Sequence, residues 1–161
     1  MEKNQKIAVV PGSFDPITKG HIAIIEKAAE LYDKVFVAVM INPNKEYMFT
    51  LEQRKLIAAA CFDGRQNIEV ISSDGWLWKL ANSLDACAIV KGYRNDKDLE
   101  YEKEMAEFND AHCHKAKTLL IKADEDFLDI SSTAVRAYIK EGKSLEALLS
   151  QAAIETINTL K

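Results

Sequence analysis

Cationic, imidazole and hydroxyl side chains recur at four separate places in the sequence, each just after a short apolar run. His21 ends the segment 11–21, and residues 42–45 include a lysine. Residues 91–94 hold two cations around a glycine, and residues 129–133 hold three hydroxyl groups. Such side chains, together with the amides of helix N-termini, are the groups that bind phosphate oxygens in proteins. The sequence therefore predicts a site for several phosphates.

Residues 11–21 contain neither a G-x-G-x-x-G fingerprint nor a Walker A loop. Gly12 and Gly20 permit either a close approach of the backbone or a positive φ. If Thr18 is the N-cap of the following helix, His21 lies in the first helical turn, where unpaired amides favour anions. There the imidazole either donates a hydrogen bond to a phosphoryl oxygen or only caps the helix. The helix dipole disfavours its imidazolium form and a bound phosphate favours it, so its protonation state stays open.

Glu102 shares the apolar face of a predicted helix with Leu99 and Met105, so its carboxylate either has a cationic partner or reaches solvent at the helix edge. No serine, cysteine or lysine shows the local pattern of a covalent nucleophile. No acidic cluster of the EF-hand type offers a permanent metal site, so we predict no protein-bound metal. Phosphate-binding groups without a nucleophile favour direct transfer between two bound substrates.

Metal and disulfide chemistry are not expected elsewhere. His112, Cys113 and His114 are metal-binding types, but residues two apart on a helix point about 200° from one another, which favours a solvated helix end. Cys61 and Cys87 lie among apolar neighbours, and no C-x-x-C pair is present. We expect ordinary free thiols in a reducing cytoplasm.

Five short apolar runs, rich in β-branched residues, predict strands, and they cover residues 7–10, 35–41, 68–71, 88–90 and 118–121. The runs are continuous, as in parallel strands that are buried on both faces. Helical periodicity and caps predict helices near residues 22–32, 50–61, 77–84, 99–106 and 131–142, followed by C-terminal helices at 145–149 and 152–160. This alternation predicts an α/β doubly wound five-stranded parallel sheet in a single domain, residues 1–161.

The expected strand order is 3-2-1-4-5, in which the winding direction reverses between the first and fourth strands. Ligands bind beyond the carboxyl ends of the strands at such a point. The polar segments after strands one, two, four and five should therefore face one crevice. A structure with His21 and Lys45 on opposite sides of the molecule would contradict this expectation.

Composition excludes several classes of function. The chain has 161 residues, of which 48% are hydrophobic, enough for a core. Its 21 basic and 25 acidic side chains argue against nucleic acid as a partner. The longest strongly apolar run, residues 35–41, is too short to span a bilayer. No cationic segment followed by an apolar one opens the chain, so we expect neither export nor membrane attachment, but a cytoplasmic location.

Residues 18–21, Thr-Lys-Gly-His, match the T-x-G-H signature of the nucleotidyltransferase superfamily, and the longer string PGSFDPITKGH resembles its phosphopantetheine adenylyltransferase family. NPNKEYMFTLEQR at 42–54, GYRNDKDLEYE at 92–102 and ISSTAVR at 130–136 match in the same order. The resemblance implies a Rossmann-like fold and transfer of AMP from ATP to 4′-phosphopantetheine, giving dephospho-coenzyme A and pyrophosphate in coenzyme A biosynthesis. It also implies Mg²⁺ with the ATP, no covalent intermediate, and a cytoplasmic homohexamer.

The resemblance implies roles for individual residues. His21, Lys45 and Arg94 would be catalytic, with His21 at the α-phosphate. The acceptor would contact Ser13, Lys45, Leu77 and Lys91, with Leu77 along the pantetheine arm. ATP would contact Ser13, Phe14, His21, Gly92, Tyr93, Arg94, Glu102, Phe127, Leu128, Asp129, Ile130, Ser131, Ser132 and Thr133.

One departure from the family affects the acceptor. Lys91 stands where the family usually has arginine, and lysine offers a compact charge in place of a planar fork that grips phosphate with two hydrogen bonds. This leaves open a cytidylyl- or adenylyltransferase of the same fold that acts on another phosphate-bearing acceptor. A non-catalytic nucleotide-binding module and a flavodoxin-like electron carrier are further alternatives.

Overall fold

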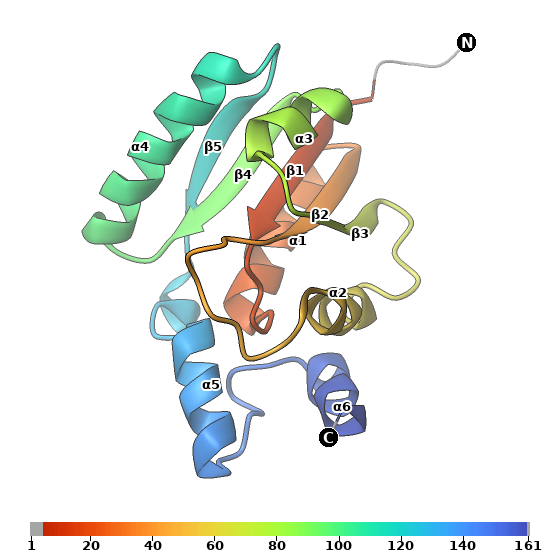
Figure 1. Ribbon diagram of the computed structural model, residues 1–161, viewed down its shortest axis with the longest axis vertical. Helices are drawn as coiled ribbons and strands as arrows, with labels where there is room; N and C mark the ends of the chain where they lie inside the picture. The colour runs from red at the N-terminus through yellow and green to blue at the C-terminus, as the bar shows by residue number, and fades with distance from the viewer. Residues whose placement is uncertain (1–4, 161) are drawn as a thin grey trace.

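The computed structural model describes residues 5–160, which form a five-stranded sheet flanked by helices (Figure 1). All strand pairs are parallel, and the order is β3-β2-β1-β4-β5. The strands are β1 (Ile7–Gly12), β2 (Lys34–Met40), β3 (Ile68–Ser73), β4 (Ala88–Tyr93) and β5 (Lys117–Lys122). The predicted doubly wound α/β fold and its strand order are confirmed.

Two helices cover each face of the sheet. The helices are α1 (Lys19–Leu31), α2 (Leu51–Ala60), α3 (Leu77–Ser83), α4 (Asp96–His112), α5 (Ser132–Glu141) and α6 (Gln151–Thr159), with a 3₁₀ turn η1 (Glu125–Phe127). Figure 1 shows α3 and α4 in front of the sheet and α1 behind it. α2 packs beside α1 against β2 and β3, and α6 packs on α2.

Burial on both faces explains the continuous apolar runs. In β1, Ala8 and Val10 pack into the core under α1 and α2, whereas Val9 packs into the core under α3. In β2, Val37 and Ala38 likewise enter opposite cores. Alternate residues of a strand point to opposite faces, so a strand covered on both sides must be apolar throughout.

Helix caps fix the starts of three helices as the sequence predicts. The Thr50 hydroxyl accepts from the Gln53 amide, and the Gln53 side chain accepts from the Thr50 amide, which completes a capping box at α2. Ser131 caps α5, and that helix ends at Gly142 with φ 70°. Thr18 caps α1, so His21 occupies the third helical position.

The predicted helix at residues 145–149 is wrong. This segment forms a single turn in which the Leu148 and Leu149 amides both donate to the Leu145 carbonyl. The Leu148 carbonyl accepts from the Lys19 amide at 2.9 Å instead of continuing a helix. Ser150 then takes an extended conformation as the N-cap of α6. Leucine periodicity here reflects burial of the turn rather than helical structure, since Leu148 and Leu149 are both buried.

Strands β1 and β4, in the middle of the sheet, are paired only at their N-terminal ends. β1 pairs with β2 through six residue pairs, but with β4 only through Ala8–Ala88 and Val9–Ile89. Beyond these pairs the two strands separate toward their carboxyl ends, where the winding direction reverses. This separation opens the crevice that the expected strand order requires.

His112, the last residue of α4, takes part in aromatic packing. Its ring centroid lies 4.5 Å from that of Phe108 and 5.2 Å from that of Trp78. The three cysteines are half-buried free thiols. Within residues 5–160, no group of three or more histidine, cysteine, aspartate or glutamate side chains is placed to hold a metal ion. In the same range, none of the helices has the length and apolar character of a membrane span.

Candidate active site

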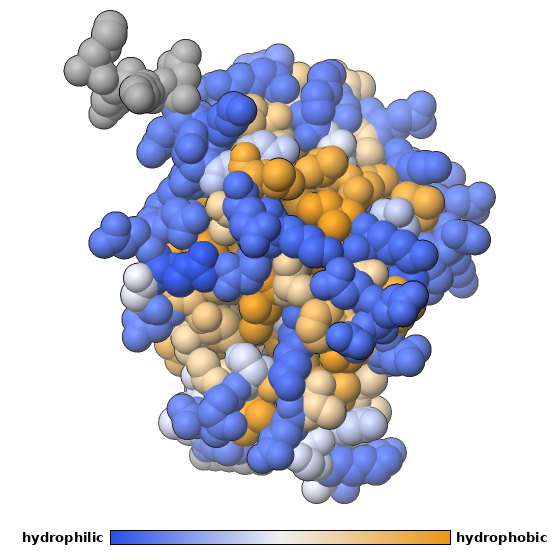
Figure 2. Space-filling view, turned by 180° about the vertical axis from the view of Figure 1, so that it is seen from behind, coloured by the Kyte–Doolittle hydropathy of each residue, from blue (hydrophilic) through white to orange (hydrophobic). Residues whose placement is uncertain are grey.

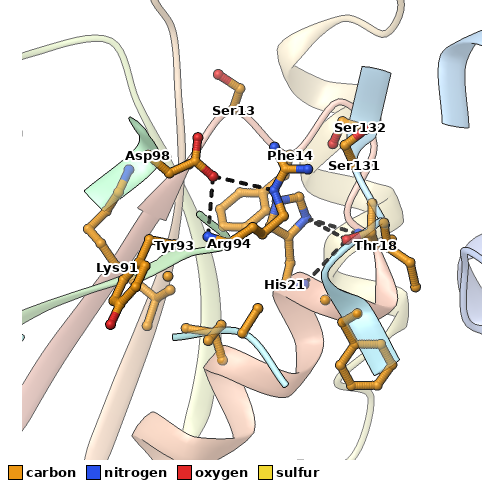
Figure 3. A pocket seen from close by; sticks show the side chains of 18 of the residues that line it. Ser13, Phe14, Thr18, His21, Lys91, Tyr93, Arg94, Asp98, Ser131 and Ser132 are labelled. Carbon is orange, nitrogen blue, oxygen red and sulfur yellow. Dashed lines mark hydrogen bonds and ion pairs between the residues drawn. The ribbon is translucent and has the colours of Figure 1, made fainter. Parts of the chain in front are cut away.

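A cavity of about 430 Å³ lies at the carboxyl ends of β1 and β4 (Figure 3). Its walls come from four parts of the chain that are far apart in sequence. These are the end of β1 with the start of α1, the β2–α2 loop, the end of β4 with the first half of α4, and the segment after β5 with the start of α5. The volume is within the usual range for small-molecule sites. It lies at the point of the sheet where doubly wound proteins bind their ligands.

Most predicted site residues line this cavity. His21 and Lys45 line it together, so the expected spatial arrangement is confirmed. The predicted residues on the cavity wall are Ser13, Phe14, His21, Lys45, Lys91, Gly92, Tyr93, Arg94, Glu102, Phe127, Ile130, Ser131, Ser132 and Thr133.

Three predicted residues lie outside the lining of the main cavity. Leu128 and Asp129 follow η1 but are not part of the wall. Leu77, at the start of α3, lines a smaller cavity of about 80 Å³ between α3, α4 and the sheet. Lys91 and Glu102 line both cavities, so the two are neighbours.

The cavity also contains charged residues that the sequence did not single out. Asp98 and Arg136 both line it. Asp98 follows Arg94 by four residues, a spacing that favours an ion pair on a helix and could have identified it. Arg136 ends the ISSTAVR string and lies one turn into α5, where it reaches back over the helix N-terminus.

Of the two roles that the sequence allows for Gly12, the structure shows the close approach. A positive φ of 47° occurs at Phe14 and at neither Gly12 nor Gly20. Gly12 provides a close approach instead, because a Cβ there would lie 2.9 Å from the Phe14 ring. The Phe14 ring in turn contacts the His21 ring edge-on, with centroids 5.0 Å apart. Gly12 therefore makes room for the aromatic ring that orients the histidine.

His21 is held in one tautomer by the cap of α1. Its Nδ1 accepts a hydrogen bond from the Thr18 amide at 3.0 Å (Figure 3). A nitrogen that accepts from an amide carries no proton, so the neutral ring is protonated at Nε2. Nδ1 also lies 3.2 Å from the Thr18 hydroxyl. The Nε2–H group is therefore left to act as a donor.

The environment keeps His21 uncharged. Burial, together with the positive charges of Lys91 and Arg94, lowers the pKa of His21 from 6.5 to about 4. The capping hydrogen bond acts in the same direction, because the imidazolium ion would direct an Nδ1–H group at the Thr18 amide. At neutral pH the ligand-free protein thus presents a neutral Nε2–H donor, which settles the question the sequence left open.

Two cations at the carboxyl end of β4 are paired with carboxylates of α4. Lys91 Nζ lies 3.4 Å from Glu102 Oε2, and Arg94 Nε lies 3.5 Å from Asp98 Oδ2. The partner of the half-buried Glu102 carboxylate is therefore Lys91. Lys45, by contrast, makes no ion pair with any residue in the described range 5–160. Within the cavity, the lysine of the β2–α2 loop has the least compensated charge.

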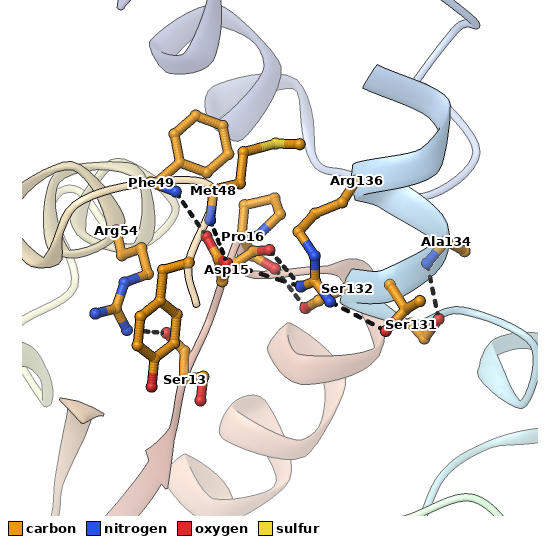
Figure 4. A network of polar contacts seen from close by, with 12 residues as sticks. Ser13, Asp15, Pro16, Met48, Phe49, Arg54, Ser131, Ser132, Ala134 and Arg136 are labelled. Carbon is orange, nitrogen blue, oxygen red and sulfur yellow. Dashed lines mark hydrogen bonds and ion pairs between the residues drawn. The ribbon is translucent and has the colours of Figure 1, made fainter. Parts of the chain in front are cut away.

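A buried polar network joins three of the cavity loops from behind (Figure 4). The Asp15 carboxylate is 2% exposed and accepts from the amides of Met48 and Phe49 at 2.9 and 3.0 Å. The Arg136 guanidinium donates to the Asp15 carbonyl at 2.9 Å. The Ser132 hydroxyl donates to the Pro16 carbonyl at the same distance. These bonds fasten the β2–α2 loop and the start of α5 to the β1–α1 loop.

Comparison with known proteins places this geometry in a family. Residues 9–138 match the model of the family described as cytidylyltransferase-like. A protein of Alkaliphilus oremlandii named phosphopantetheine adenylyltransferase is 38% identical over 144 residues, which is 89% of this chain and 92% of the relative.

Two further relatives carry the same name. The protein of Alkaliphilus metalliredigens is 42% identical and covers 84% of this chain and 86% of its own length. That of Streptococcus pneumoniae strain JJA is 34% identical over 159 residues, 98% of both chains. Because the family model spans most of the chain and the relatives align along nearly their whole length, this chain belongs to the phosphopantetheine adenylyltransferase family of cytidylyltransferase-like proteins.

Proposed function

We propose that this protein transfers AMP from ATP to 4′-phosphopantetheine, giving dephospho-coenzyme A and pyrophosphate. One observation carries the proposal: His21, Lys45, Lys91 and Arg94 line a single cavity together with the hydroxyls at the start of α5. An acidic chain that gathers these groups in one place is suited to two phosphate-bearing substrates. The name that its relatives share indicates which two these are.

The proposed reaction is a direct displacement. An oxygen of the acceptor phosphate forms a bond to the α-phosphorus of ATP, and the bond from that phosphorus to the bridging oxygen of the β-phosphate breaks. Pyrophosphate leaves with the electron pair. Because the phosphoryl centre gains negative charge in the transition state, catalysis requires positioned donors and cations rather than a covalent intermediate.

His21 is the proposed donor at the α-phosphate. Its Nε2–H would donate to a non-bridging oxygen and strengthen that bond as the charge develops. Since Nδ1 is occupied by the Thr18 amide, the ring keeps this tautomer without reorganisation. The aromatic contact with Phe14 fixes the ring plane. Both features prepare the donor before the substrate binds.

The cations would divide between the two substrates. Lys45 and Lys91 would bind the acceptor phosphate, and Arg94 would bind the polyphosphate of ATP. The carboxylates of Glu102 and Asp98 must then give up part of their contact with Lys91 and Arg94. The free protein thus holds these cations in place with internal anions that the phosphates replace.

Other residues that line the two cavities would contact the rest of ATP and of the acceptor. The amides and hydroxyls at Ser131–Thr133 lie at the N-terminus of α5 and would bind phosphate oxygens, while Phe127 and Ile130 offer apolar surface to the adenine. Leu77 in the smaller cavity would contact the pantetheine arm. Mg²⁺ would arrive as part of the ATP complex, because the carboxylates of the main cavity are engaged with cations. A cytoplasmic homohexamer is part of the same proposal.

The function is tested by supplying purified protein with ATP or CTP and a panel of phosphate-bearing acceptors. We expect dephospho-coenzyme A and pyrophosphate in equal amounts from ATP and 4′-phosphopantetheine, and little product from CTP. Product with another acceptor only would identify a different transferase of this fold. ATP binding by calorimetry without turnover of any acceptor would identify a non-catalytic module.

The alternative function is transfer to a different phosphate-bearing acceptor, and the Lys91–Glu102 ion pair motivates it. Lysine grips phosphate less specifically than arginine, and here it is also shared with a carboxylate. Comparing Lys91→Arg with the wild type distinguishes the two cases. A similar kcat/KM for 4′-phosphopantetheine in both proteins supports the proposed acceptor. A gain of about tenfold or more in Lys91→Arg would indicate an acceptor site adapted to another phosphate.

A further inference from the structure

Arg54, in α2, is a charged residue in the interior of the protein. It is 1% exposed. Its Nη1 donates to the backbone carbonyl of Ser13 at 2.7 Å and to that of Met40 at 2.9 Å. Ser13 directly follows β1 and Met40 ends β2, so one nitrogen joins the ends of two neighbouring strands (the bond to Ser13 is drawn in Figure 4).

This burial is costly. Within residues 5–160 the Arg54 guanidinium has no ion-pair partner, and its Nε has no hydrogen-bond acceptor. Burial lowers the pKa of Arg54, while the nearby Tyr47 and Asp15 act in the opposite direction. A buried cation with an unsatisfied N–H group destabilises a fold unless what it holds together offsets the cost.

The face of the guanidinium holds the loop that carries Lys45. The carbon of the Arg54 guanidinium lies 3.9 Å from the centroid of the Tyr47 ring. The Tyr47 hydroxyl accepts from the Asn42 amide at 2.7 Å, which closes the base of the loop. Inside the loop, the Asn42 side chain accepts from the Asn44 amide, and the Asn42 carbonyl accepts from the Lys45 amide, each at 3.0 Å.

Residues 42–46 are exposed, and the hydrogen bonds described for them lie within the loop or join it to Tyr47. The Met48 and Phe49 amides tie the C-terminal end of this loop to Asp15. In the described structure, the contact from residues 42–45 to the core runs through Asn42 and Tyr47 to Arg54. A lysine side chain is flexible, so its position over the cavity depends on the backbone that carries it. Displacement of a positioned group by about 1 Å can cost a large factor in rate.

We propose that Arg54 and Tyr47 are positioning residues that act through Lys45. The stacked pair holds the Lys45 loop over the cavity, and the same guanidinium holds that loop in register with Ser13 of the β1–α1 loop. The expected effect on kcat/KM rests on the proposed function. The expected effect on the order of the Lys45 loop does not. Neither Arg54 nor Tyr47 lines the cavity.

The test is a double-mutant cycle of Tyr47→Leu with Lys45→Ala, measured with ATP and 4′-phosphopantetheine. Tyr47→Leu should lower kcat/KM for the acceptor by about tenfold or more and change the KM for ATP by less than about twofold. In the Lys45→Ala background, Tyr47→Leu should cause no further loss, since the group it positions is absent. Independent, multiplicative losses in the double variant would overturn the proposal.

Conservative variants separate the stack from the hydroxyl. Tyr47→Phe keeps the ring over the guanidinium and should retain more activity than Tyr47→Leu. Arg54→Lys keeps the charge but loses the planar face, and should behave like Tyr47→Leu if it folds. Tyr138→Leu is the matched control, because it removes a tyrosine that faces Lys143 at 5.1 Å, away from the cavity, and should leave kcat/KM unchanged.

Amide hydrogen exchange in the ligand-free protein tests the positioning without any substrate. In Tyr47→Leu, protection of the Asn42 and Lys45 amides should fall by about tenfold or more, while protection in β1 and β2 stays as in the wild type. Unchanged protection at Asn42 and Lys45 would overturn the proposal whatever the activity. If the wild type makes no dephospho-coenzyme A but this loss of protection is observed, the proposed function fails and the positioning role stands.

Discussion

The His21 imidazole connects the fold to the chemistry through its two nitrogens. Nδ1 completes the cap of α1 by accepting from the Thr18 amide, and this bond leaves the proton on Nε2. The same ring is kept neutral by burial and by the charges of Lys91 and Arg94. The donor that the proposed reaction needs is thus produced by the local structure that begins the helix.

Replacing His21 tests whether these two roles can be separated. His21→Ala should lower kcat about a hundredfold or more, as for the loss of a donor at a developing oxyanion. It should also destabilise the protein by roughly 0.5–2 kcal/mol through the lost cap. Rates and urea unfolding curves measure the two effects.

Gln53→Ala is the matched control for His21→Ala. Gln53 occupies the same position in the capping box of α2, but it does not line the cavity. Its replacement should cost a similar amount of stability and leave kcat unchanged. Equal loss of activity in both variants would mean that His21 acts only as a cap.

The protonation of His21 can be observed directly. Nitrogen-edited NMR of the ligand-free protein should show the Nε2–H tautomer at neutral pH and a titration midpoint of about 4 for His21. Because the pKa is lower in the folded than in the unfolded protein, the stability that His21 contributes is complete above pH 6.5. It is lost as the pH falls from 6.5 toward 4. A midpoint near 6.5, or an Nδ1–H tautomer, would contradict this account.

Among the elements, the separation of β1 from β4 creates the cavity, and α1 fits closely against β4 at that point. A Cβ at Gly92 would lie 2.9 Å from Cγ1 of Ile24 in α1. Gly92→Ala should therefore force α1 away from β4 and cost about 1–3 kcal/mol. Thermal unfolding measures this as a decrease of about 2–4 °C in Tm per kcal/mol.

Gly75→Ala provides the comparison for Gly92→Ala. The nearest atom to a Cβ at Gly75 is the Ser73 hydroxyl oxygen at 4.0 Å, an ordinary contact, and Gly75 precedes α3 outside the cavity. Its Tm should stay within about 1 °C of the wild type, as for most surface substitutions. Equal Tm values for the two variants would show that α1 and β4 adjust without cost.

Sequence patterns predicted those elements whose signals are local. Apolar runs identified the five strands, and Thr18, Thr50 and Ser131 marked helix starts, because caps act within one helical turn. The helix predicted at residues 145–149 was wrong, since a buried turn and a helix can show the same spacing of leucines. Its actual conformation is set by a hydrogen bond to Lys19, more than a hundred residues away.

The site was predictable only in part, because sequence patterns reveal local structure but not contacts between distant residues. Its cations and hydroxyls follow strands, and the strand order brings them together. The carboxylates paired with these cations, and the buried contacts of Asp15 and Arg54, depend on tertiary packing. No local pattern distinguishes a buried arginine that joins two strands from one on a helix surface.

At the scale of the whole molecule, apolar surface remains uncovered in the single chain. Leu31, Leu56, Trp76 and Leu119 are between 36% and 58% exposed. Figure 2 shows hydrophobic side chains gathered in the upper part of the face opposite to that of Figure 1, bordered by hydrophilic ones. Surfaces of this kind favour association with other protein chains.

We expect the assembly to be a homohexamer. Sedimentation velocity should give a species of six 18.1 kDa chains. Dilution should not dissociate it at micromolar concentration, since obligate interfaces bury large apolar areas. A single species at the mass of one chain would contradict this expectation without affecting the site, whose described walls all come from one chain.

Four parts of the chain that are far apart in sequence should form one binding site for the triphosphate and the acceptor. A crystal structure with a non-hydrolysable ATP analogue and 4′-phosphopantetheine tests it most directly. We predict that an oxygen of the α-phosphate accepts from His21 Nε2 and that the acceptor phosphate contacts Lys45. Binding of the nucleotide outside the cavity, or an α-phosphate beyond hydrogen-bond distance of His21, would contradict the account.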